Sequence, residues 1–309
     1  MASRSTTTAL DLLRRIAPQD AAAVDSSRRP FPMMIPGLAD PGSRLLVIGC
    51  GHSGTHAIYS TLQRHAIAAS HEGIGRQATV GWMYAADGTH PNASDLWTFR
   101  NKAPLQTPHD PIIKIHRDPL FVIAALANGF TENGKCYQGP YDALSWNVAA
   151  RFIPLPEARA ISRGWTCRLD WDARVRMALH YWVKWNLLSD RWATMRFQVE
   201  NLTFSVLASA WCAHCQRVGH CQQVPTRVCK AGAVPTGKHS RVRETRGGHN
   251  STSRPMAWNE LAILDPGMTL VARLLADEYG YAYPQAPMVI PSTTLPHPSA
   301  YRRSGGRAV

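Results

Sequence analysis

A short glycine-containing segment near residue 50 carries residue types that can bind a phosphate group. It reads GCGHSGTH over residues 49–56. Glycine allows tight turns and lets the backbone approach an anion closely. Serine, threonine and histidine side chains can donate further hydrogen bonds to phosphate oxygens. We therefore expect a phosphate-binding loop made of Gly51, His52, Ser53, Gly54, Thr55 and His56.

The segments on both sides of this loop predict a strand and a helix. RLLVIGC, at 44–50, is a compact apolar run typical of a buried parallel strand. Apolar residues recur at helical spacing in 57–67. A helix that begins directly after the loop would point its unpaired N–H groups at a bound anion. The Walker A motif requires a lysine after the last glycine, and Thr55 and His56 follow it here, which disfavours an ATP- or GTP-dependent enzyme.

A second apolar run ends in an arginine. PIIKIH, at 111–116, predicts another buried strand, and Arg117 follows it directly. The residues after Arg117 have helical spacing. A guanidinium can bind phosphate through two parallel hydrogen bonds, which makes Arg117 a second candidate phosphate ligand.

In this order, the segments resemble the sulfotransferase superfamily. HSGTH resembles the family's 5′-phosphosulfate loop, usually [KR]-x-G-[ST]-[ST], with His52 at the basic position. IIKIHRDPLFVIAAL resembles the 3′-phosphate element, with Arg117 as the phosphate ligand and Ala125 where the family has serine. MRFQVENL and the segment 257–281 are similar to later family elements, so the likeness spans residues 44–283. It implies 3′-phosphoadenosine 5′-phosphosulfate (PAPS) as the donor and a small-molecule or carbohydrate acceptor with a hydroxyl or amine.

The resemblance also implies catalytic groups. Glu72 lies 20 residues after His52, near the distance at which related branches carry a glutamate base, and His71 is the second candidate base. A surface His–Glu pair is the alternative. A protonated His52 would stabilise the leaving phosphate, and no metal is required. Lys238 and Arg241, with Arg243, lie in a basic glycine-rich loop that would either reach the 3′-phosphate or remain solvated.

Two other functions stay open beside sulfuryl transfer. One is a small-molecule kinase with a P-loop, and the other is a nucleotide-binding relative without catalytic activity. The chain has a formal net charge of +13, yet no nucleic-acid-binding motif accompanies it. We therefore expect either a solvated basic surface or a phosphate-rich small ligand, with nucleic-acid binding as a weaker alternative.

Strands that alternate with helices predict the fold class. We expect an α/β fold with three layers, α/β/α, and a mainly parallel central sheet. The resemblance implies the P-loop nucleoside triphosphate hydrolase-like arrangement of sulfotransferases. Further helices are predicted at 170–192, after 202, and over 258–281 with a break at Pro266–Gly267; a strand is predicted at 194–202. Residues 44–283 would form the domain, with flexible tails at 1–43, containing a short helix near 8–16, and at 284–309.

The cysteine pattern leaves its chemistry open. Cys212, Cys215, Cys221 and Cys229 cluster, and their spacing allows a disulfide, free core thiols or, less well, zinc. No run of 18 apolar residues is present, so we expect no membrane span. The first 20 residues lack a secretory signal, which predicts a cytoplasmic protein. Their Ser, Thr and Arg content leaves plastid targeting open.

Overall fold

A five-stranded parallel sheet forms the centre of the computed structural model. The structure describes residues 7–26, 44–71, 77–81, 109–128, 131–132, 135–136, 170–219, 228–229 and 254–283. The sheet order is β2-β3-β1-β4-β7, and every pair is parallel. The strands are β1 (Arg44–Gly49), β2 (Ala69–His71), β3 (Ala78–Gly81), β4 (His109–His116) and β7 (Met195–Gln198). The expected α/β class with a parallel sheet is confirmed. A separate antiparallel pair joins β5 (Thr131–Glu132) to β6 (Lys135–Cys136).

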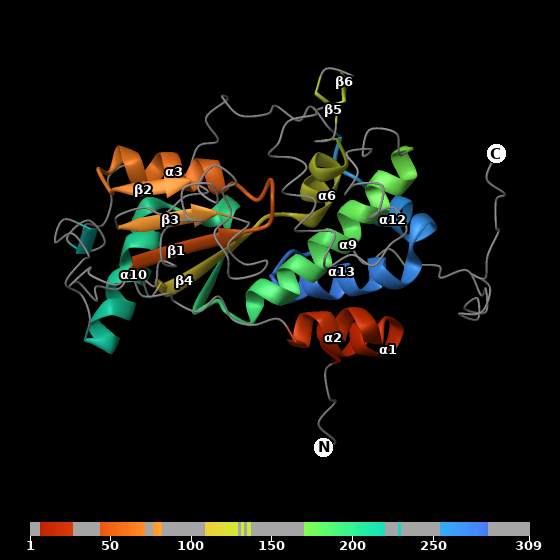
Figure 1. Cartoon of the computed structure of the whole chain (residues 1–309), viewed down its shortest axis with the longest axis horizontal. Helices are drawn as coiled ribbons and strands as arrows, with labels where there is room; N and C mark the ends of the chain where they lie inside the picture. The colour runs from red at the N-terminus through yellow and green to blue at the C-terminus, as the bar shows by residue number, and fades with distance from the viewer. Residues whose placement is uncertain are drawn as a thin grey trace, which may run out of the picture.

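Helices flank this sheet on both faces because the strand side chains alternate in direction. In β1, Leu45 and Val47 pack with α3 (Thr55–Arg64) and α10 (Phe204–Val218). Leu46 and Ile48 point the other way, toward α6 (Pro119–Asn128) and α9 (Trp171–Asp190). Figure 1 shows these strands side by side, with α3 and α10 at the left of the view and α6 and α9 toward the right. Both faces of β1 are buried, as its continuous apolar sequence predicts.

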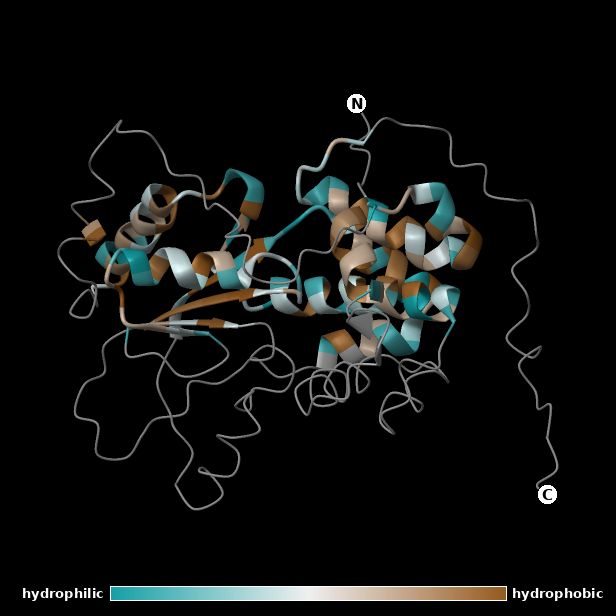
Figure 2. Ribbon diagram, turned by 90° about the horizontal axis from the view of Figure 1, so that it is seen from above, coloured by the Kyte–Doolittle hydropathy of each residue, from teal (hydrophilic) through white to brown (hydrophobic). Residues whose placement is uncertain are grey.

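A helical group extends the core beyond the sheet. It contains α9, α12 (Trp258–Leu264), α13 (Pro266–Glu278) and two N-terminal helices, α1 (Ala9–Ile16) and α2 (Pro18–Ser26). These helices carry both apolar and polar residues (Figure 2), and α9, in their midst, is buried all round from Met177 to Ser189. The break in the C-terminal helical segment falls at Asp265, one residue before the expected Pro266. Asp265 caps α13 by accepting from the Met268 N–H at 2.9 Å.

The N-terminal helices correct the expectation of a tail over residues 1–43. The helix predicted near 8–16 is present, but Ala9 and Leu13 are fully buried and belong to the main core. The Glu278 carboxylate of α13 accepts a hydrogen bond from the Ala9 N–H at 2.7 Å. In Figure 1, α1 and α2 lie against the helical group. Residues 9–26 are therefore part of the folded unit, because their apolar faces complete its core.

One buried ion pair gives this correction a test. Asp20 of α2 lies 2.7 Å from Lys184 Nζ of α9, with side chains 8% and 2% exposed. Asp20→Asn should lower the free energy of unfolding by about 3 kcal/mol, since it leaves the lysine charge buried without its partner. The matched control is Asp25→Asn, whose pair with Arg14 at 3.2 Å is 43% and 49% exposed and should matter by less than about 1 kcal/mol. Urea unfolding measures both variants, and equal small effects would mean that α2 does not dock.

None of the helices in the described part of the chain combines the length and apolar character needed to cross a membrane.

Candidate functional site

The glycine loop and Arg117 follow neighbouring parallel strands. β1 pairs with β4 in a register that sets Gly49 opposite Ile115, so the loop begins beside the residues that lead to Arg117. From β1 the chain passes through α3 to β2 and β3 on one side, whereas from β4 it passes through α6 and α9 to β7 on the other. Ligand crevices of open parallel sheets form where such connections part, at the carboxyl ends of the strands. The loop and Arg117 therefore follow the carboxyl ends of the two adjacent strands at which these connections part.

The loop backbone uses left-handed conformations. His52 has φ 63° and Gly54 has φ 93°. The Ser53 N–H donates to the Cys50 carbonyl at 3.0 Å, which closes a tight turn. Gly54 packs closely against Val199 of η2 (Val199–Asn201). A Cβ added at Gly54 would lie only 2.8 Å from Val199 Cγ2. Glycine at 54 is thus required twice, by φ and by this close approach.

The N-cap residue of α3, Gly54, gives no side-chain cap, in contrast to the N-cap residues of α1, α9, α10 and α13. Thr8, Asp170, Thr203 and Asp265 each cap the first turn of α1, α9, α10 and α13. Gly54 has no side chain to do the same for α3. Unpaired N–H groups and the positive end of the helix dipole attract an anion. The α3 terminus therefore has the chemistry to hold a phosphate in the place of a cap.

His71 lies at the edge of this site, at the end of β2. Its Nε2 is 3.1 Å from the Thr55 hydroxyl, and its ring stacks on His56 with centroids 3.8 Å apart. Burial, with a smaller effect of the His56 charge, lowers the pKa of His71 to about 4. A neutral His71 is a weak proton acceptor at neutral pH. In the neutral tautomer that carries its proton on Nε2, His71 donates to the Thr55 oxygen. The Thr55 hydroxyl hydrogen can then point toward a bound anion.

The other predicted site residues divide between those the structure brings to this edge and those outside the described residues. Gly51, His52, Ser53 and Thr55 lie in the loop or at the start of α3, and Ser53 is buried. The Arg117 guanidinium lies 6.0 Å from the centroid of the Phe121 ring. Glu72, Lys238, Arg241 and Arg243 lie outside the residues that the structure describes.

A buried lysine behind the site was not anticipated from the sequence. Lys114 of β4 is fully buried, and its Nζ donates to Asp190 Oδ1 at 2.8 Å and to the Asn186 carbonyl at 2.8 Å. It also contacts the Tyr279 hydroxyl. Burial lowers the pKa of Lys114 to about 8, and the Asp190 carboxylate opposes that shift. The network ties the end of β4 to α9 and α13. Its only signal in the sequence is one lysine inside the apolar run IIKIH.

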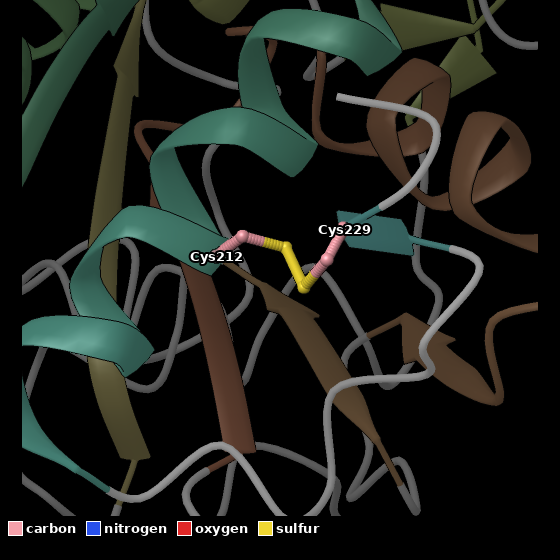
Figure 3. Close-up of a disulfide and its surroundings, with 2 residues drawn as sticks. All are labelled: Cys212 and Cys229. Atoms are coloured by element: carbon pink, nitrogen blue, oxygen red, sulfur yellow. A yellow bond between two sulfur atoms is a disulfide. The ribbon is translucent and has the colours of Figure 1, made fainter. Parts of the chain in front are cut away.

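The cysteine cluster forms a disulfide. Cys212 of α10 is bonded to Cys229, with Cα atoms 5.5 Å apart (Figure 3). Cys50 is a buried free thiol whose pKa is raised by burial, and Cys215 is also buried. Within the described residues no group of three His, Cys, Asp or Glu side chains is arranged to hold a metal ion. Of the alternatives left open by spacing, the disulfide is the one present for Cys212 and Cys229.

No protein-family model, no curated protein and no solved structure matches the chain.

Proposed function

We propose that the chain is a sulfotransferase that moves a sulfuryl group from PAPS to a hydroxyl or amine of a small-molecule or carbohydrate acceptor. One observation carries the proposal. The glycine loop and Arg117 follow adjacent parallel strands, β1 and β4, at the point where their connections part. PAPS has a phosphosulfate at one end of the ribose and a 3′-phosphate at the other, so it needs two anion sites close together. The P-loop-like, sulfotransferase type of this fold is part of the same proposal.

The residues of the loop would hold the 5′ end of the donor. Backbone N–H groups at the α3 terminus and the Thr55 hydroxyl donate to the phosphate oxygens. His52, when protonated, stabilises the negative charge that develops on the leaving phosphate. PAPS supplies the sulfuryl group and leaves as adenosine 3′,5′-bisphosphate. A bond from sulfur to the acceptor oxygen or nitrogen forms as the bridging S–O bond breaks, and Glu72 takes the acceptor proton.

Nucleotide binding tests the donor site directly. The wild-type chain should bind adenosine 3′,5′-bisphosphate more tightly than adenosine 5′-phosphate or MgATP in isothermal titration calorimetry. Arg117→Ala should weaken binding of the bisphosphate about 30-fold, since a charge-assisted phosphate contact is worth about 2 kcal/mol. Arg15→Ala is the matched control, because Arg15 is exposed on α1, which packs against α2 and α13.

Transfer of ³⁵S from labelled PAPS to a metabolite extract tests the reaction itself. Glu72→Ala should remove the labelled product and keep nucleotide binding. MgATP turnover without binding of the bisphosphate would support a kinase instead. Binding of the bisphosphate with no labelled product from any extract would support a relative without catalytic activity.

A further inference from the structure

We propose that Glu200 and Tyr281 form a clamp that positions Arg117, and that this clamp sets the selectivity of the site for a 3′-phosphate. The inference rests on the proposed function, because it concerns the nucleotide that Arg117 would bind. Both residues lie far from Arg117 in the sequence. Glu200 belongs to η2, directly after β7, and Tyr281 follows α13.

The clamp holds the peptide groups on both sides of Arg117. On one side, the Asp118 N–H donates to Glu200 Oε1 at 3.1 Å. On the other side, the Tyr281 hydroxyl lies 3.2 Å from the His116 carbonyl oxygen, to which it can donate. The same hydroxyl lies 3.0 Å from Glu200 Oε2, so its single proton is shared between these two acceptors and the two clamp residues contact each other. The short link between β4 and α6 is therefore fixed at both ends of the residue that would bind phosphate.

The electrostatics keep the clamp in its donating state. Burial and the neighbouring Glu200 carboxylate raise the pKa of Tyr281, so its hydroxyl stays protonated and able to donate. Asp118 is held as well, because its Oδ1 accepts from the Tyr283 hydroxyl at 2.5 Å and from the Leu120 N–H at 2.9 Å. The latter bond caps α6 and fixes the direction in which the helix leaves Arg117.

The turn η2 connects the clamp to the glycine loop. Val199 packs against Gly54 of the loop, and the next residue, Glu200, holds the link that carries Arg117. One short turn thus contacts both candidate anion sites. A ligand with two phosphates a fixed distance apart gains affinity when its two sites are held rigidly relative to each other. This is the reason to expect the clamp to act on the 3′-phosphate, and not only on stability.

Comparing two ligands separates positioning from general stability. Binding of adenosine 3′,5′-bisphosphate and of adenosine 5′-phosphate is measured for the wild type, Glu200→Ala, Glu200→Gln and Tyr281→Phe. Glu200→Ala should weaken the bisphosphate about tenfold, since it removes the carboxylate that accepts from Asp118 and contacts Tyr281, and change the 5′-phosphate by less than about twofold. Glu200→Gln should recover most of the loss, because its amide oxygen can still accept from Asp118. Tyr281→Phe removes only a hydroxyl and should cost about threefold for the bisphosphate.

A double-variant measurement and a control complete the test. In an Arg117→Ala background, Glu200→Ala should have no further effect on the bisphosphate. Asp172→Asn, an exposed carboxylate in the first turn of α9, is the charge-matched control. Equal weakening of both ligands, or an undiminished effect without Arg117, would show a purely structural role and overturn the clamp while leaving the proposed function intact. If the wild type binds neither nucleotide, the proposed function fails, and the selectivity role of the clamp fails with it.

Discussion

Gly54→Ala should lower the free energy of unfolding by about 3 kcal/mol and abolish measurable nucleotide binding. Two costs add. At φ 93° an L-residue is strained by about 1–2 kcal/mol. The new Cβ would also lie 2.8 Å from Val199 Cγ2, and relieving such a contact costs about 1–3 kcal/mol. The relief must move either η2 or the loop, so the backbone N–H groups at the α3 terminus lose their common direction. Urea unfolding and calorimetry with adenosine 3′,5′-bisphosphate measure the two effects.

Gly219 provides the control for this substitution. It ends α10 with φ 74°, and a Cβ there would meet nothing within 4 Å. Gly219→Ala should therefore cost only the conformational strain, about 1 kcal/mol, and leave nucleotide binding unchanged. Combining Gly54→Ala with Val199→Ala removes the clash and should recover the difference between the two glycines. Gly54 and Gly219 variants of equal stability would refute the close approach of η2 to the loop.

The parts of the fold that the sequence predicts are those fixed by local pattern. β1, the loop and α3 follow one another within 21 residues, from Arg44 to Arg64, and each has its own signal: a continuous apolar run, three glycines, and helical spacing. The same holds for β4 with α6, and for α9, whose cap at Asp170 accepts from the Ala173 N–H at 2.7 Å. In each case, local preference and tertiary burial favour the same conformation.

The elements that the sequence did not predict depend on distant partners. β2 and β3 have only three and four residues, and they are strands because β3 pairs with β1 and β2 pairs with β3. The docking of α1 also depends on a distant partner. No feature of the sequence near Ala9 predicts that its N–H donates to Glu278 of α13.

The same limit applies to the candidate site. Gly54, Thr55 and Arg117 could be named because their residue types match phosphate chemistry in a readable order. Val199, Glu200 and Tyr281 could not, because a Val, a Glu and a Tyr become part of the site only through contacts with Gly54, Asp118 and His116. Residues that bind a ligand have a chemical signature, whereas residues that position them are defined by the fold.

Between pH 6.5 and pH 4, the wild-type chain should lose stability more steeply than His116→Phe. Burial, followed by the charges of Lys114 and Arg196, lowers the pKa of His116 from 6.5 to about 3. In this window the unfolded chain binds a proton at His116 that the folded chain does not bind, so the free energy of unfolding falls as the pH falls. The slope from this group reaches about 1.4 kcal/mol per pH unit.

Phenylalanine keeps the ring that stacks on Tyr279, with centroids 4.3 Å apart, and cannot be protonated. His65→Phe is the control, because His65 also stacks on an aromatic ring, Phe204, at 3.6 Å but is exposed. Urea unfolding at half-unit pH steps should give a clearly flatter curve for His116→Phe. Partial burial also lowers the pKa of His65, so His65→Phe should flatten the curve less. Parallel curves for the wild type and His116→Phe would mean that His116 is not buried in its neutral form.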